Sequence, residues 1–190
     1  IEEYLKLLVR SGRMRRSGVL WEVPYTPGEK FDVPRIVDEA ISHRLVRIEG
    51  AVRDVLEWAA VIDAPLTARE LAEYTSLPGV ERAPPAEVAE SLLSELVLEQ
   101  FLRREGTLYF FAHEAARGVV YDAIDEADRR RRHGDVAKRF LTGKTEADFE
   151  HLEEIAHHLF HSDEPFRAGS YLLRAGERAR KAGAFREAAL

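Results

Sequence analysis

Residues 101–110 of the chain read Phe101-Leu102-Arg103-Arg104-Glu105-Gly106-Thr107-Leu108-Tyr109-Phe110. Two apolar runs flank a polar centre that contains a glycine, and this pattern predicts a β-hairpin that turns at Glu105-Gly106. Three helical patterns precede the hairpin along the chain. Three helices followed by a β wing are the order of a winged helix.

Each of the three helices has its own sequence signal. The first has apolar residues along one face: Val52, Val55, Leu56 and Ala59. The second begins with the capping box Thr67-Ala68-Arg69-Glu70 and continues through Tyr74. In such a box the first and last side chains, here Thr67 and Glu70, accept hydrogen bonds from free backbone N–H groups at the helix start. The third follows Pro84-Pro85 and carries five apolar side chains: Val88, Leu92, Leu93, Leu96 and Val97. With a further helix at 35–48, these signals predict a winged-helix domain over residues 34–125.

The flanking segments predict two further parts. Residues 1–33 contain a helical pattern over 1–12, a first hairpin over 13–23 and a linker with prolines and glycine. Residues 126–190 are helical in pattern, and small residues recur four apart, as where helical hairpins stack closely. The predicted fold class is therefore mainly α: a winged-helix domain with small β-hairpins, followed by the truncated start of a tetratricopeptide-like helical repeat.

Composition narrows the classes of protein to consider. The 190 residues include no cysteine, which excludes disulfides and thiolate metal sites and fits a reducing compartment. The apolar runs are too short to span a bilayer, and no basic leader precedes an apolar stretch, so we expect a cytoplasmic protein without membrane contact. The chain starts without Met and stops within a helical pattern at Ala188-Ala189-Leu190, which predicts that both ends are cuts through a larger protein.

Charge argues against direct contact with nucleic acid. The chain has 28 basic and 34 acidic residues, a formal net charge of -6. The third helix of the predicted winged helix would enter a DNA groove, yet between Ala86 and Gln100 it has no Lys or Arg and four carboxylates: Glu87, Glu90, Glu95 and Glu99. Carboxylates repel phosphate and release no counterions, so we expect a protein partner and no direct nucleic-acid contact.

Two stretches of the sequence resemble phosphate-binding segments only in part. Gly143-Lys144-Thr145 ends like a phosphate-binding loop, but the position five residues before Gly143 is Lys138 and not the glycine that the loop needs. The run Arg129–Arg132 is flanked by acidic residues at helical spacing, which predicts a solvated face of ion pairs.

Histidines gather near the C-terminal end at His151, His157, His158 and His161. His157 and His161 are four residues apart, as a zinc pair on one helical face would be. The residue after the first of them is His158 and not a glutamate base, and no third carboxylate or cysteine ligand stands at a convincing spacing. We therefore predict no metal site from the sequence.

One longer motif resembles a known family. Phe111, His113, Arg117, Val119 and Tyr121 spell F-x-H-x-x-x-R-x-V-x-Y, followed by the arginine-rich run and the 152–158 helix. This string resembles the STAND-type signalling ATPases of bacteria, including regulators related to the maltose-regulon activator and the ATPase modules of some kinases and cyclases. The start of the chain resembles the end of the ATPase lid, and residues 171–188 resemble the first tetratricopeptide repeat.

The resemblance implies a regulatory function within a larger chain. In that family a P-loop ATPase precedes the lid, winged helix and repeats, so the partners expected are an upstream ATPase domain and downstream repeats of the same chain. ADP or ATP would be the cofactor of the parent protein, with none in this segment. The matching histidine in the family reaches the β-phosphate of ADP and holds the closed state, which makes His113 the candidate nucleotide-binding residue; no residue is a candidate for catalysis.

Three alternatives stay open at this point. His113 can instead be a residue that packs at the hairpin–helix junction and caps a backbone group. The chain as a whole can be a stand-alone protein-interaction adaptor, or a winged-helix transcription regulator.

Overall fold

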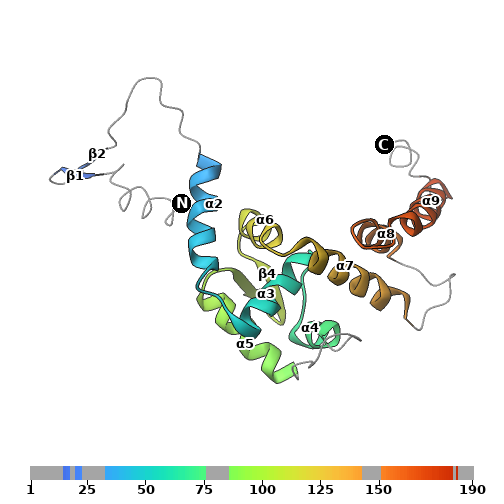
Figure 1. Cartoon of the computed structure of the whole chain (residues 1–190), viewed down its shortest axis with the longest axis horizontal. Helices are drawn as coiled ribbons and strands as arrows, with labels where there is room; N and C mark the ends of the chain where they lie inside the picture. Colours follow the sequence, from blue (N-terminus) through green and yellow to red (C-terminus); the bar gives the residue numbers. More distant parts are fainter. Residues whose placement is uncertain are drawn as a thin grey trace.

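The chain is mainly helical, with small antiparallel β-hairpins (Figure 1). The computed structural model describes residues 15–17, 20–22, 33–75, 86–142, 151–181 and 183. Within these ranges lie eight helices and two two-stranded sheets. The helix predicted over 1–12, the linker residues Pro24 and Pro27 and the run Gly143-Lys144-Thr145 lie outside the described residues, whereas Pro34, which was also expected in the linker, belongs to the first turn of a helix over Val33–Leu45.

The order of elements follows the order that the sequence predicts. The elements are β1 (Arg15–Ser17), β2 (Leu20–Glu22), α2 (Val33–Leu45), α3 (Gly50–Ile62), α4 (Ala68–Thr75), α5 (Ala86–Leu98), β3 (Leu102–Glu105), β4 (Leu108–Phe111), α6 (Glu114–Asp122), α7 (Glu126–Leu141), α8 (Leu152–Phe160) and α9 (Pro165–Lys181). Strands β1 and β2 pair antiparallel, as the first predicted hairpin requires.

The start of α4 is fixed by the predicted capping box. The Thr67 amide donates to Glu70 Oε2 at 2.8 Å, and the Glu70 amide donates to Thr67 Oγ1 at 3.1 Å. Reciprocal bonds of this kind satisfy N–H groups that have no partner inside a helix. The segment that links α3 to α4 is therefore held in one conformation at its α4 end.

The second hairpin turns one residue later than predicted. Glu105 pairs with Leu108, so β3 includes Glu105 and the turn residues are Gly106 and Thr107. Gly106 has a φ of +62°, a conformation that glycine adopts without steric cost. Leu66 and Tyr109 also exchange backbone hydrogen bonds of 3.1 and 2.9 Å, which join the α3–α4 connection to the hairpin.

A first hydrophobic core lies among α2–α6 and the hairpin. Its largest fully buried side chains include Trp58, Leu56, Leu93, Leu96 and Phe101. The predicted apolar face of α5 needs one correction: Val88 is 45% exposed, and Ala89 is the buried residue in that turn. The buried face of α5 therefore begins at Ala89 and not at Val88.

A second core lies among α7, α8 and α9. Its buried members are Ala137, Leu152, Ile155, Ala156, Leu159, Ala168 and Tyr171. Helix α7 supplies Val136 to the first core and Ala137 to the second. In Figure 1, α7 runs from the body formed by α3–α6 toward α8 and α9, so this helix is shared by both cores.

Among the described residues, no helix is both long enough and apolar enough to cross a membrane.

The first core predicts the effect of truncating α5. Leu96 is 0% exposed, so Leu96→Ala should lower the free energy of unfolding by about 2–5 kcal/mol through lost burial and a residual cavity. Leu98, in the same helix, is 83% exposed and provides the control: Leu98→Ala should change it by about 0.5 kcal/mol or less. Chemical denaturation measures both values, and equal effects of the two variants would contradict this orientation of α5.

Candidate functional site

His113 lies at the junction between β4 and α6. It is the N-cap residue of α6, with extended backbone angles of φ −147° and ψ 140°, and its carbonyl accepts from the amides of Ala116 and Arg117. Its side chain is exposed and makes no capping hydrogen bond to the described start of α6. The backbone at His113 is thus fixed by the helix while the imidazole faces solvent.

Arg117, the arginine of the same motif, holds α6 to the end of α3. Its Nε lies 3.0 Å from Asp63 Oδ1, its Nη2 lies 2.6 Å from Glu114 Oε1, and its Nη1 donates to the Ala60 carbonyl at 3.4 Å. Asp63 ends α3 with a left-handed φ of 53°. Burial raises the pKa of Asp63, and the Arg117 guanidinium opposes that rise. Arg117 therefore has a structural role, which is to hold α6 against the end of α3.

A hollow of about 170 Å³ lies beside this junction, between the end of α3 and the hairpin. Its polar lining comes from Asp63, Arg103, Glu114 and Arg117, and its floor is aromatic and aliphatic. Arg103 lies over the Phe110 ring at 4.6 Å and forms an ion pair with Glu105. The carboxylates of the hollow already face Arg117, so its charges are largely balanced.

The histidines predicted near the C-terminal end meet a further histidine that the sequence analysis did not single out. His133 of α7 packs against His157, His158 and His161, with ring centroids 5.7, 5.0 and 5.2 Å away. Its Nδ1 lies 2.8 Å from Nδ1 of His158, and its Nε2 lies 2.8 Å from the Tyr121 hydroxyl. His151 lies apart from this group, next to Phe140 and Glu154.

Two members of this histidine cluster (His133, His157, His158 and His161) are buried and two are exposed. His133 is 1% and His158 3% exposed, whereas His157 and His161 face solvent. Burial, followed by the imidazoles of His161 and His157, lowers the pKa of His133 to about 3. Burial, followed by His133, lowers the pKa of His158 to about 3 as well. Both buried imidazoles are therefore neutral near pH 7, the form that binds metal.

The arginine run largely forms the ion pairs that its sequence predicts. Arg129 lies 3.7 Å from Asp122, Arg130 lies 2.5 Å from Glu126, and Arg131 lies 3.1 Å from Asp128. The Arg130 and Arg131 pairs are three or four residues apart and exposed, as in a solvated helix face, whereas Arg129 is half-buried and reaches Asp122 seven residues before it.

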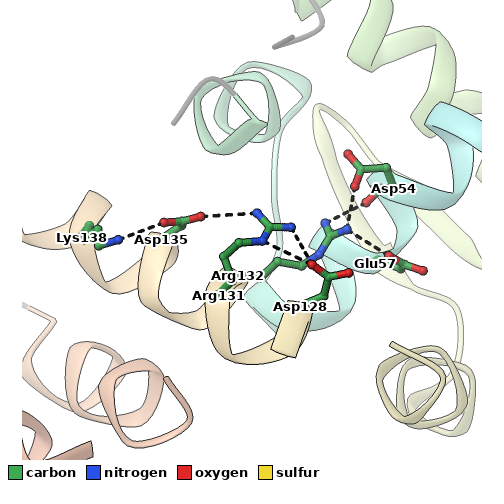
Figure 2. Close-up of polar contacts among 7 residues, drawn as sticks. All are labelled: Asp54, Glu57, Asp128, Arg131, Arg132, Asp135 and Lys138. Atoms are coloured by element: carbon green, nitrogen blue, oxygen red, sulfur yellow. Dashed lines mark hydrogen bonds and ion pairs between the residues drawn. The ribbon is translucent and has the colours of Figure 1, made fainter. Parts of the chain in front are cut away.

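Arg132 corrects this prediction, because it is not on the solvated face. It is 4% exposed and crosses to α3, where Nη2 lies 2.6 Å from Asp54 Oδ1 and 3.0 Å from Glu57 Oε2 (Figure 2). Its guanidinium also lies over the Trp58 ring at 4.9 Å. Figure 2 shows Arg131, the preceding residue, turned instead toward Asp128 and Asp135. Arg132 therefore docks α7 on α3, and its charge is already paired.

No family model, curated protein or solved structure matches the chain.

The pairing of Arg132 predicts a stability difference between neighbouring arginines. Arg132→Ala should lower the free energy of unfolding by about 2–4 kcal/mol, because the buried side chain loses its packing on the Trp58 ring and the carboxylates of Asp54 and Glu57 lose a shared cation, with only Arg53 left to pair with Glu57. Asp54 is more accessible, which keeps the loss below that of a fully buried pair. Arg131→Ala removes an exposed pair with Asp128 and a 3.7 Å contact with the buried Asp135, which keeps Lys138 as its partner, so it should cost about 1 kcal/mol or less. Urea unfolding of the two variants makes the comparison, and similar losses would show that Arg132 is not a docking residue.

Proposed function

We propose that the chain is a regulatory relay segment of a larger signal-transduction NTPase. It would couple a nucleotide-bound core to a helical-repeat domain that senses a signal or binds a partner. The observation that carries the proposal is that the side chain of His113 is exposed while its backbone is fixed at the start of α6. Arg117 and Tyr121 of the same motif instead have structural contacts, with Asp63 and with His133.

The exposure of His113 favours an external ligand over a packing role. A packing or capping histidine would be covered, or would bond to a backbone group at the start of α6. The side chain of His113 is exposed and makes no such bond to the described helix start. An imidazole can donate a hydrogen bond to phosphate and can carry charge near neutral pH. This position therefore suits contact with a nucleotide bound on a neighbouring domain.

The arrangement of α3, α4, α5 and the hairpin supports the winged-helix part of the proposal. In that interpretation β3 and β4 are the wing, and the Leu66–Tyr109 pairing is the short strand that joins the first two helices to it. His113 then lies where the wing returns to the helical body, a place from which a ligand-induced shift would move α6.

The charge of α5 favours a protein partner over DNA. Glu87, Glu95 and Glu99 are exposed, and Glu90 forms an ion pair of 2.8 Å with Arg104 of the wing. The exposed face of the helix that would enter a DNA groove is thus acidic, and one wing arginine is already paired. The transcription-regulator alternative therefore has no electrostatic support on this face.

Helices α8 and α9 support the interpretation as the start of a helical repeat. They pack on each other through the second core, and three large apolar side chains of α9 stay exposed: Phe166, Leu172 and Leu173. In a repeat array each unit leaves an apolar face that the next unit covers. Further repeats of the same chain would be the partners of this face.

Catalysis would belong to the upstream NTPase domain and not to this segment. The sequence has no G-x-x-x-x-G-K-[ST] loop, and phosphoryl transfer depends on such a cradle together with a magnesium site. ADP or ATP would then be bound by the parent protein, and His113 would contribute one contact to it.

The test of this proposal is nucleotide preference in the full-length protein. His113→Ala should weaken ADP binding roughly ten-fold or more relative to ATP binding, because a hydrogen bond to a charged phosphate contributes about 1.5–3 kcal/mol and acts in only one state. Isothermal titration of both nucleotides on one variant measures the ratio. The melting temperature should change by about 2 °C or less, since the side chain is exposed.

The matched control is His43→Ala, which removes another exposed histidine on α2 and should leave both affinities unchanged. The 190-residue chain by itself should show no ATP turnover. An unchanged ADP-to-ATP ratio in His113→Ala would end the nucleotide-contact proposal.

A further inference from the structure

We propose that His133, His157 and His158 bind a divalent transition metal ion of the zinc class, with His161 as an available fourth imidazole. One ring nitrogen from each of the first three residues lies within 4.8 Å of the other two. The residues come from two helices, His133 from α7 and the others from α8. This site is independent of the nucleotide contact proposed for His113.

The ligand set determines the class of ion. Zinc takes imidazole nitrogens at about 2.0–2.1 Å in tetrahedral geometry, which places two ligand nitrogens about 3.3 Å apart. The Nδ1 atoms of His133 and His158 are 2.8 Å apart, and the largest separation in the set is within 4.8 Å. To reach that spacing the 2.8 Å pair must separate by about 0.5 Å, and a pair at the 4.8 Å limit must close by about 1.5 Å, which side-chain rotation can supply. Imidazole ligands suit zinc, copper and nickel, whereas magnesium and calcium need oxygen ligands.

Tyr121 orients His133 for such a role. The Tyr121 hydroxyl lies 2.8 Å from Nε2 of His133, so its oxygen can accept a hydrogen bond from the Nε2–H group and leave Nδ1 as the unprotonated ligand atom. Metal-binding histidines commonly donate the other ring N–H to a neighbouring acceptor, which fixes the tautomer and the ring direction. In the metal-free state the Nδ1 proton of His158 would lie between the two rings; when the ion binds, His158 would change tautomer, so that its proton moves to Nε2 and the Nδ1 lone pair binds the ion.

The surroundings are compatible with a positive ion. His133 and His158 are buried and packed against each other, and the neutral form of an imidazole is the one that binds a metal ion. The nearby cation of Arg129 is held by Asp122 and lies over the Tyr121 ring. Exposed His157 and His161 leave a path for the ion from solvent.

Binding of the metal ion would link the two cores. His133 projects from the helix that both cores share, and His157 and His158 lie in the second core's α8. An ion bound by residues of both helices stabilises their packing in the folded state only, so the melting temperature should rise with the logarithm of the ion concentration once that exceeds the Kd.

The experiment titrates the chain with zinc chloride after treatment with a chelator and removal of any polyhistidine tag. We expect one zinc per chain by isothermal titration calorimetry, with a micromolar or tighter Kd, and a higher melting temperature with zinc. Cobalt chloride should give the visible absorption of a tetrahedral nitrogen-ligated Co²⁺ site, because Co²⁺ occupies the same kind of site.

Variants then assign the ligands. His157→Ala removes an exposed ligand, so the metal-free variant should keep its melting temperature while zinc affinity falls about ten-fold or more. Tyr121→Phe, which removes the hydroxyl that orients His133, should weaken zinc binding about ten-fold. His151→Ala is the matched control, since His151 is also exposed, precedes the same helix and lies outside the cluster. Absence of stoichiometric zinc binding, or equal loss in His157→Ala and His151→Ala, would overturn the proposal.

Discussion

The buried guanidinium of Arg132 is the contact on which the rest of the architecture depends. It docks α7 on α3 through Asp54, Glu57 and the Trp58 ring. The next residue, His133, faces α8. Two neighbouring residues of α7 thus contact different cores: Arg132 forms ion pairs with α3 of the first core, and His133 contacts α8 of the second. Because α7 belongs to both cores, we expect a shift at one contact to reach the other.

A continuous set of contacts leads from His113 to the second core. His113 begins α6, Arg117 in the first turns of α6 binds the end of α3, and Tyr121 near its end bonds to His133 of α7. His133 in turn meets His158 of α8. If a ligand at His113 moves α6, the displacement reaches α8 through two side-chain contacts. The proposed metal ion would strengthen the last contact and so bias the same path.

Sequence signals predicted the elements better than the contacts between them. The capping box at Thr67 and Glu70 and the second hairpin depend on neighbours along the chain, so local patterns identify them; the turn was placed one residue early because Glu105 pairs within β3. Arg132 reaches Asp54 across 78 positions, and its spacing does not distinguish it from the three arginines before it. His133 and His158 are 25 residues apart and meet only because α7 packs on α8. The exposure of His113 likewise follows from the way α6 packs.

Coupling between the two cores through α7 can be measured directly by native-state amide hydrogen exchange on Arg132→Ala. Amides exchange through local or larger opening reactions, so a coupled unit loses protection as a whole. If α7 joins the cores, loss of its ionic contact with α3 should lower protection in α8 about as much as in α3. If the amides of α8 and α9 keep their original protection while α3 and α7 lose theirs, the two cores are independent and the chain cannot relay a shift between them.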